Sequence, residues 1–101
     1  MQYELDQPLL DHRDQPITET VNGEVVTITL GVALERAAMF GGAGTDDAAK
    51  KFAQYQLAKL CSSGKTVVLN AEEVSALKAL AAVVYSAVGY GAIVEALENP
   101  L

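Results

Sequence analysis

The chain has 101 residues, 50% of them hydrophobic, and a formal net charge of −6. A chain of this length is expected to form one domain spanning residues 1–101, and its apolar content argues against intrinsic disorder. An acidic surface repels phosphate groups. We therefore expect neither nucleic-acid binding nor attachment to a membrane through a basic face.

Cysteine content and targeting signals narrow the class of protein further. The single cysteine, Cys61, has no partner for an intramolecular disulfide and cannot build a thiolate cluster for zinc. The first ten residues include Glu4 and Asp6 and lack a basic start, unlike a secretory signal. The apolar run at 79–84 is too short to span a membrane. We therefore expect a cytoplasmic protein.

The first 29 residues are predicted to be β-rich. Asn22-Gly23 lies between two segments of β-formers, 17–21 and 24–29. This dipeptide favours a type I′ turn because both central residues need positive φ. Alternation places Val26 and Ile28 on one face of the second strand. The polar stretch 11–15 follows another extended segment, so we expect a hairpin or a three-stranded meander.

Two helices are predicted after this β-rich segment. Thr29 is suited to cap a helix over 30–40, and the glycine-rich segment 41–44 ends it. Thr45 is suited to cap the second helix, and Asp46 and Asp47 then lie in its first turn. The helix is predicted to end at the segment Ser62-Ser63-Gly64. The apolar positions at helical spacing predict its buried stripe, which consists of Ala49, Phe52, Ala53, Gln56, Leu57 and Leu60.

Two further helices complete the predicted fold. Asn70 and Glu73 have the spacing of a capping box at the start of a third helix, 71–84. The apolar pattern changes phase near Tyr85-Ser86, and a fourth helix follows that ends before Pro100. The predicted fold class is α+β, with a β-rich segment at 1–29 and about four helices packed as a small bundle within 30–98.

The sequence contains weak signals for chemistry, and each has a simpler explanation. The glycine-rich segment 41–44 precedes a helix, as phosphate loops do, but it lacks the Walker spacing and lysine. Asp11, His12 and Asp14 include only one imidazole, which is too few ligands for a typical metal site. Cys61 lies 49 positions from that histidine and is better explained as a small buried residue. We expect no catalytic residue, cofactor or metal.

The apolar excess of the last two helices predicts an interaction surface. Several apolar residues lie outside the main stripes, and a helix that is apolar over more than one face is either central or packed on another chain. Tyrosine is also favoured where a partly buried ring meets a partner. The candidate surface, and the expected homodimer contact, consists of Tyr85, Tyr90, Val83, Ala79, Ile93 and Leu97.

Several segments carry a resemblance to a known group of proteins. They are 7–11 (QPLLD), 27–32 (TITLGV), 55–60 (YQLAKL), 68–74 (VLNAEEV), Leu77-Lys78 and 85–88 (YSAV) with Val94 and Leu97. In this order they resemble small proteins of tailed bacteriophages and prophages. The resemblance covers most of the chain and rests on caps, stripes and turns. It implies a phage origin and transfers no catalytic residue. The long Asn22-Gly23 hairpin and the missing proline after Tyr85-Ser86 depart from the group.

Three classes of function follow from these observations. The leading hypothesis is a non-enzymatic protein–protein interaction module, phage- or prophage-encoded and homo-oligomeric. It would act in virion assembly or as an accessory factor, in the cytoplasm of a bacterial host or in the virion. The alternative is an early-expressed regulator that binds and inhibits a host protein through its acidic surface. A small ligand-binding or enzymatic domain is disfavoured.

Overall fold

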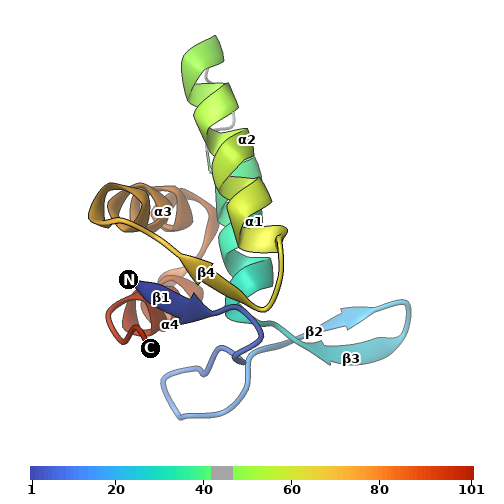
Figure 1. The fold of residues 1–101 in the computed structure, drawn as a ribbon. Helices are drawn as coiled ribbons and strands as arrows, with labels where there is room; N and C mark the ends of the chain where they lie inside the picture. The colour runs from blue at the N-terminus through green and yellow to red at the C-terminus, as the bar shows by residue number, and fades with distance from the viewer. Residues whose placement is uncertain (42–46) are drawn as a thin grey trace.

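The computed structural model describes residues 1–41 and 47–101. It has an α+β fold in which the strands form two separate two-stranded antiparallel sheets, β1–β4 and β2–β3, accompanied by four helices (Figure 1). The predicted fold class is confirmed. The elements are β1 (Gln2–Glu4), β2 (Thr18–Val21), β3 (Glu24–Thr27), α1 (Leu30–Phe40), α2 (Ala48–Ser62), β4 (Thr66–Val68), α3 (Ala71–Val84) and α4 (Ala87–Leu97).

Helix α1 is the centre of the helical part. It contacts α2 most extensively, then α3, and it also touches α4. Its residues Leu34, Ala37 and Ala38 are all fully buried. Helices α1 and α2 lie side by side, and α3 and α4 lie to one side of that pair (Figure 1). Because α2 and α3 both pack on α1, each keeps a large part of its surface exposed.

The sheet formed by β1 and β4 is not among the elements predicted from the sequence. Tyr3 pairs with Val67 in an antiparallel register. Its fully buried side chain reaches across the core, and its hydroxyl donates a hydrogen bond to the Leu97 carbonyl at the end of α4 (2.6 Å). The amino-terminal strand therefore joins β4 to the last helix.

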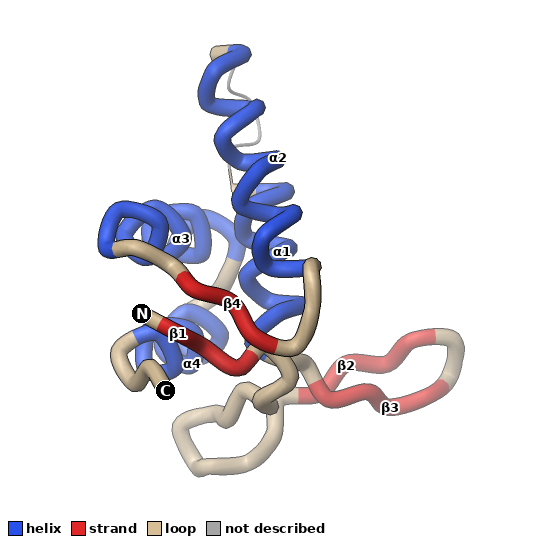
Figure 2. Tube along the Cα trace, in the orientation of Figure 1, coloured by secondary structure: helices blue, strands red, loops and turns tan. Residues whose placement is uncertain are grey.

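The predicted Asn22-Gly23 hairpin is confirmed, with φ of 51° at Asn22 and 82° at Gly23. All of β3 is exposed, including Val26, and Ile17 and Ile28 at the base of the hairpin are half-buried against the core. Figure 2 shows why: the hairpin projects away from the helices.

The segment 8–10 does not add a regular third strand to this hairpin. It makes only two isolated bridges, Pro8 with Thr29 and Leu10 with Pro16. The Leu9 amide donates to the Ile28 carbonyl (3.0 Å), and the Ile17 amide donates to the Leu9 carbonyl (2.9 Å). These bonds fix the base of the hairpin to the body of the protein.

Replacing Gly23 with valine is expected to open the hairpin locally. A Cβ at this position would meet no atom within 4 Å, so the cost comes from positive φ alone. That cost is about 1–2 kcal/mol for a non-glycine residue. Amide hydrogen exchange in β2 and β3 should accelerate about tenfold or more. Unchanged exchange at the Val21 and Glu24 amides would contradict the turn assignment.

The helix boundaries agree closely with the capping signals. The Thr29 hydroxyl accepts a hydrogen bond from the Val32 amide at the start of α1. The predicted capping box of Asn70 and Glu73 is confirmed, with reciprocal hydrogen bonds of 2.8 and 2.9 Å. Helix α2 is capped by the Asp47 side chain. The segment 42–46, with the expected cap Thr45 and most of the glycine-rich segment, lies outside the described residues.

Candidate functional site

Helix α2 packs on α1 through a different face from the one predicted. Leu57 and Ala58 pack against the core and Cys61 is buried, and these positions share one side of the helix at i, i+1 and i+4. Gln54, one turn earlier on that side, donates a hydrogen bond to the Ala38 carbonyl of α1 (3.2 Å). The packing face of α2 is therefore narrow and partly polar.

Five of the six residues predicted to be buried on α2 are exposed, and this prediction is wrong. Only Leu57 packs inward. Phe52 is 52% exposed and Leu60 is 36% exposed. The other five residues form the surface that we call the α2 stripe: Ala49, Phe52, Ala53, Gln56 and Leu60. A surface helix normally turns its strongest apolar stripe inward. Here that stripe is left open.

The α2 stripe borders a groove between α2 and α3. Seven residues line a hollow there with a volume of about 230 Å3: Ala53, Gln56, Leu57 and Leu60 from α2, and Glu72, Glu73 and Ala76 from α3. A second hollow adjoins it along α2, sharing Gln56, Leu60 and Glu73 and adding Lys59 and Ser63. We call these two hollows together the α2–α3 groove. Its floor is apolar, and its α3 wall is acidic.

Charge is divided unevenly across the groove. Helix α2 carries three of the seven basic residues of the chain, Lys50, Lys51 and Lys59, and no acidic residue occurs in 48–62. Helix α3 begins with Glu72 and Glu73. The Glu73 carboxylate accepts a hydrogen bond from the Asn70 amide (2.9 Å) and is held in the capping box. The first turn of α3 is also favourable for a carboxylate because the helix end is partly positive.

The outer flank of the α2 stripe is aromatic. The rings of Phe52 and Tyr55 meet edge to face with their centres 6.1 Å apart. The Lys59 ammonium lies 5.7 Å from the centre of the Tyr55 ring, within the range of a cation–π contact. Tyr55 is 60% exposed. Aromatic residues are enriched at protein interfaces relative to the rest of the surface.

The structure divides the six residues predicted for an interaction surface. Ile93 and Leu97 are 0% and 1% exposed. They therefore belong to the core and cannot contribute to an exposed surface. Ala79 and Val83 are exposed on α3, three and seven positions after Ala76. They therefore lie on the same face of α3 as Ala76, which lines the groove. The exposed apolar surface of α3 thus continues along the helix beyond the groove.

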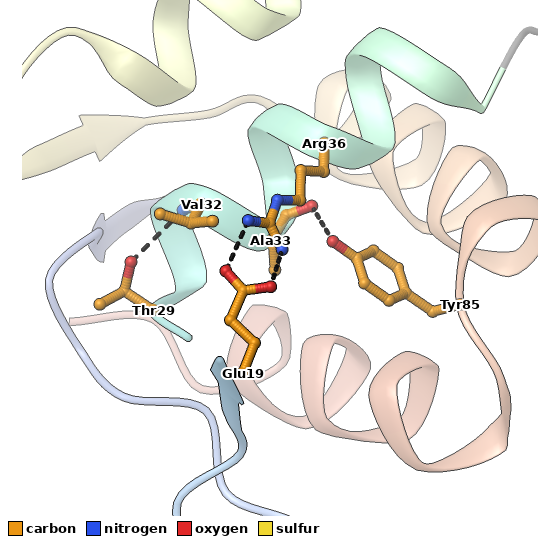
Figure 3. Close-up of polar contacts among 6 residues, drawn as sticks. All are labelled: Glu19, Thr29, Val32, Ala33, Arg36 and Tyr85. Carbon is orange, nitrogen blue, oxygen red and sulfur yellow. Dashed lines mark hydrogen bonds and ion pairs between the residues drawn. The ribbon is translucent and has the colours of Figure 1, made fainter. Parts of the chain in front are cut away.

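The two tyrosines of the predicted surface are half-buried and pack against the core. The Tyr85 hydroxyl donates to the Ala33 carbonyl of α1 (3.0 Å), as Figure 3 shows. Its ring also fills the space beside Gly89, whose position would bring a Cβ within 3.1 Å of the ring. Tyr85 and Tyr90 thus mainly fix the packing of α4, rather than forming an open surface.

Glu19 and Arg36 anchor the hairpin to α1. The Arg36 guanidinium donates two hydrogen bonds to the Glu19 carboxylate, of 2.9 and 2.6 Å (Figure 3). This pairing holds the pKa of Glu19 below its ordinary value of 4.5. Because the lowered pKa belongs to the folded state, the pair stabilises the fold above about pH 4.5, and this contribution is lost as the pH falls further.

The weak chemical signals of the sequence do not converge in the structure. Cys61 is buried under α1, whereas His12 lies beside α4 in a shallow hollow with Asp11 and Glu95. In residues 1–41 and 47–101, no group of three or more His, Cys, Asp or Glu side chains is arranged to hold a metal ion. Every buried side-chain nitrogen or oxygen in the same ranges has a hydrogen-bond partner.

The Cys61 thiol is expected to be unreactive in the folded protein. Burial raises its pKa from 9.0 to about 12, so the fold disfavours the thiolate. Reaction with a disulfide reagent at pH 8 should be on the order of 100-fold slower than in urea. The Cys61 thiol should not affect the free energy of unfolding below pH 9. As the pH rises from 9 toward 12, that free energy should fall, because the thiol ionises in the unfolded chain and stays protonated in the folded one. Equal rates in buffer and in urea would place the thiol at the surface.

No family model, curated protein or solved structure matches the chain. No helix of the described residues is long and apolar enough to cross a membrane. The α2 stripe, the α2–α3 groove and the charges beside them are therefore the features on which an account of function must rest.

Proposed function

We propose that this chain is a non-enzymatic protein–protein interaction module that binds its partner through the α2 stripe. We also propose that it is encoded by a tailed phage or prophage and acts in the cytoplasm of the bacterial host, in virion assembly or as an accessory factor. The observation that carries the proposal is the exposure of Phe52, Ala53 and Leu60 on one side of α2.

The exposed stripe has the composition of a binding surface. Its centre is apolar and aromatic, and charged residues lie at its edges, which is the usual arrangement in protein interfaces. Exposed apolar surface has a cost in solubility, and a monomeric protein seldom leaves such a stripe beside a groove without a use for it. The helix-in-groove mode of recognition uses apolar anchors at i, i+3, i+4 and i+7. Ala49, Phe52 and Ala53 have the first three of these spacings, and Leu60 follows Ala53 at i+7.

Site-specific photocrosslinking in cells tests this proposal. A photoreactive benzoylphenylalanine at Gln56 lies in the middle of the α2 stripe, and the same group at Lys51 lies nearly opposite on the same helix. Cells that express each variant from the native locus are irradiated, and adducts are identified by mass spectrometry. We expect a protein adduct from position 56 and none from position 51.

The outcomes separate clearly. A virion component or a second copy of the chain in the adduct would support a role in assembly, and a host protein would favour the regulator. Equal adducts from both positions, or no adduct from position 56, would overturn the assignment of the α2 stripe.

A further inference from the structure

We propose that the Glu19–Arg36 pair is a pH-sensitive latch that fixes the direction in which the β2–β3 hairpin projects. When the latch opens, the hairpin stays paired and swings about its base. This device does not depend on the α2 stripe or on its partner. It rests on the two different ways in which the hairpin is attached to the rest of the protein.

The base of the hairpin is held by groups that do not titrate. The Leu9 amide donates to the Ile28 carbonyl (3.0 Å), and the Ile17 amide donates to the Leu9 carbonyl (2.9 Å). Leu9 is buried, and both isoleucines pack against the core. This attachment therefore stays in place when a side-chain charge changes. It can still act as a hinge, because a few residues at the end of an element can absorb large changes in φ and ψ.

The Glu19–Arg36 pair supplies the second attachment. Within residues 1–41 and 47–101, it is the one side-chain ion pair or hydrogen bond that joins β2 or β3 to a helix. Every residue of these strands other than Glu19 is exposed. The guanidinium binds both carboxylate oxygens, at 2.9 and 2.6 Å, and a bidentate contact of this kind fixes orientation as well as distance (Figure 3). The pair therefore sets the angle between the hairpin and α1.

Protonation of Glu19 opens the latch because it removes the charge that Arg36 binds. Hydrogen bonding by Arg36 holds the pKa of Glu19 below its ordinary value of 4.5, so the latch is closed at neutral pH and opens below about pH 4.5. Two other titratable groups act on Arg36, and neither replaces Glu19. Glu35 belongs to α1 itself and cannot attach the hairpin. Burial raises the pKa of Tyr85, so its hydroxyl stays neutral in this range.

Residual dipolar couplings of the backbone amides test the latch, because they report the direction of the hairpin relative to the helices. In the wild type at pH 7, the couplings of β2 and β3 should fit the same alignment as those of α1 and α3. Glu19→Thr keeps a strand-forming residue but cannot reach Arg36. In this variant at pH 7, and in the wild type at pH 3, the order parameters of the hairpin should fall from about 0.85 to below about 0.6. Cross-strand contacts between Thr18 and Thr27 should persist.

Matched variants separate the latch from other effects of acid. Glu24→Thr makes the same change in β3, where the carboxylate forms no ion pair within the described ranges, and it should behave as the wild type does at both pH values. Glu19→Thr should show no further change between pH 7 and pH 3. Hairpin couplings that still fit the alignment of the helices in Glu19→Thr would overturn the latch, and so would a wild-type hairpin already averaged at pH 7. Loss of the cross-strand contacts would overturn it too, because the pair would then stabilise the hairpin itself rather than its direction.

Discussion

Replacing Tyr3 with alanine is expected to lower the free energy of unfolding by about 3–5 kcal/mol, the range for removing a large aromatic side chain from a core. Tyr3 is fully buried, and its ring fills the space between the β1–β4 sheet and α4. Its hydroxyl also satisfies the Leu97 carbonyl at the end of α4. Urea unfolding measured by circular dichroism gives the change directly.

The variant Tyr3→Phe separates packing from hydrogen bonding. It keeps the ring and removes only the donor, so the buried Leu97 carbonyl loses its partner at a cost of about 1–3 kcal/mol. Phenylalanine should therefore be clearly less damaging than alanine. If Tyr3→Ala cost less than about 1 kcal/mol, as a surface substitution does, β1 would not be docked on α4.

Replacing Gly41 with valine is the second substitution with a large expected effect. A Cβ at this position would lie 2.7 Å from the Leu80 Cβ and 2.8 Å from the Leu80 carbonyl oxygen. Because backbone is among the atoms in the way, α1 and α3 must separate at this end. Overpacking of this kind costs about 1–3 kcal/mol, and the branched side chain places valine at the upper end.

A matched control for this substitution is available in α4. A Cβ at Gly91 would meet no atom within 4 Å, so Gly91→Ala should be neutral or should stabilise the helix by up to about 1 kcal/mol. Thermal unfolding of both variants provides the comparison. An equal melting temperature for Gly41→Val and wild type would mean that α1 and α3 do not approach closely, and the wall of the α2–α3 groove would then be misplaced.

Local signals in the sequence were sufficient for most of the secondary structure. Asn22-Gly23 specified its turn through the positive φ of both residues, and Asn70 with Glu73 marked the start of α3 through reciprocal hydrogen bonds. Such signals depend on residues a few positions apart. The pairing of β1 with β4 joins segments more than sixty positions apart, and no local pattern in 66–68 indicates a partner strand.

The candidate site could not be read from periodicity for a related reason. Helix α2 has apolar residues on two different faces. The face with the larger side chains, which includes Phe52 and Leu60, is the one that periodicity predicts to be buried. The face that packs on the core is instead the narrower one, with Leu57, Ala58 and Cys61, because small residues of α1 such as Gly31 allow α2 to approach closely there. Only the tertiary arrangement shows which phase is left exposed, and with it the surface for a partner.

The central claim is that the apolar stripe of α2 lies outside the folded core, and Phe52→Ser tests it most directly. The measurement is the free energy of unfolding in dilute solution, where any dimer is dissociated. Because the side chain is 52% exposed, we predict a loss below about 1 kcal/mol. A loss of about 3–5 kcal/mol would be the cost of a buried aromatic ring. That result would place Phe52 in the core and leave α2 no apolar face for a partner.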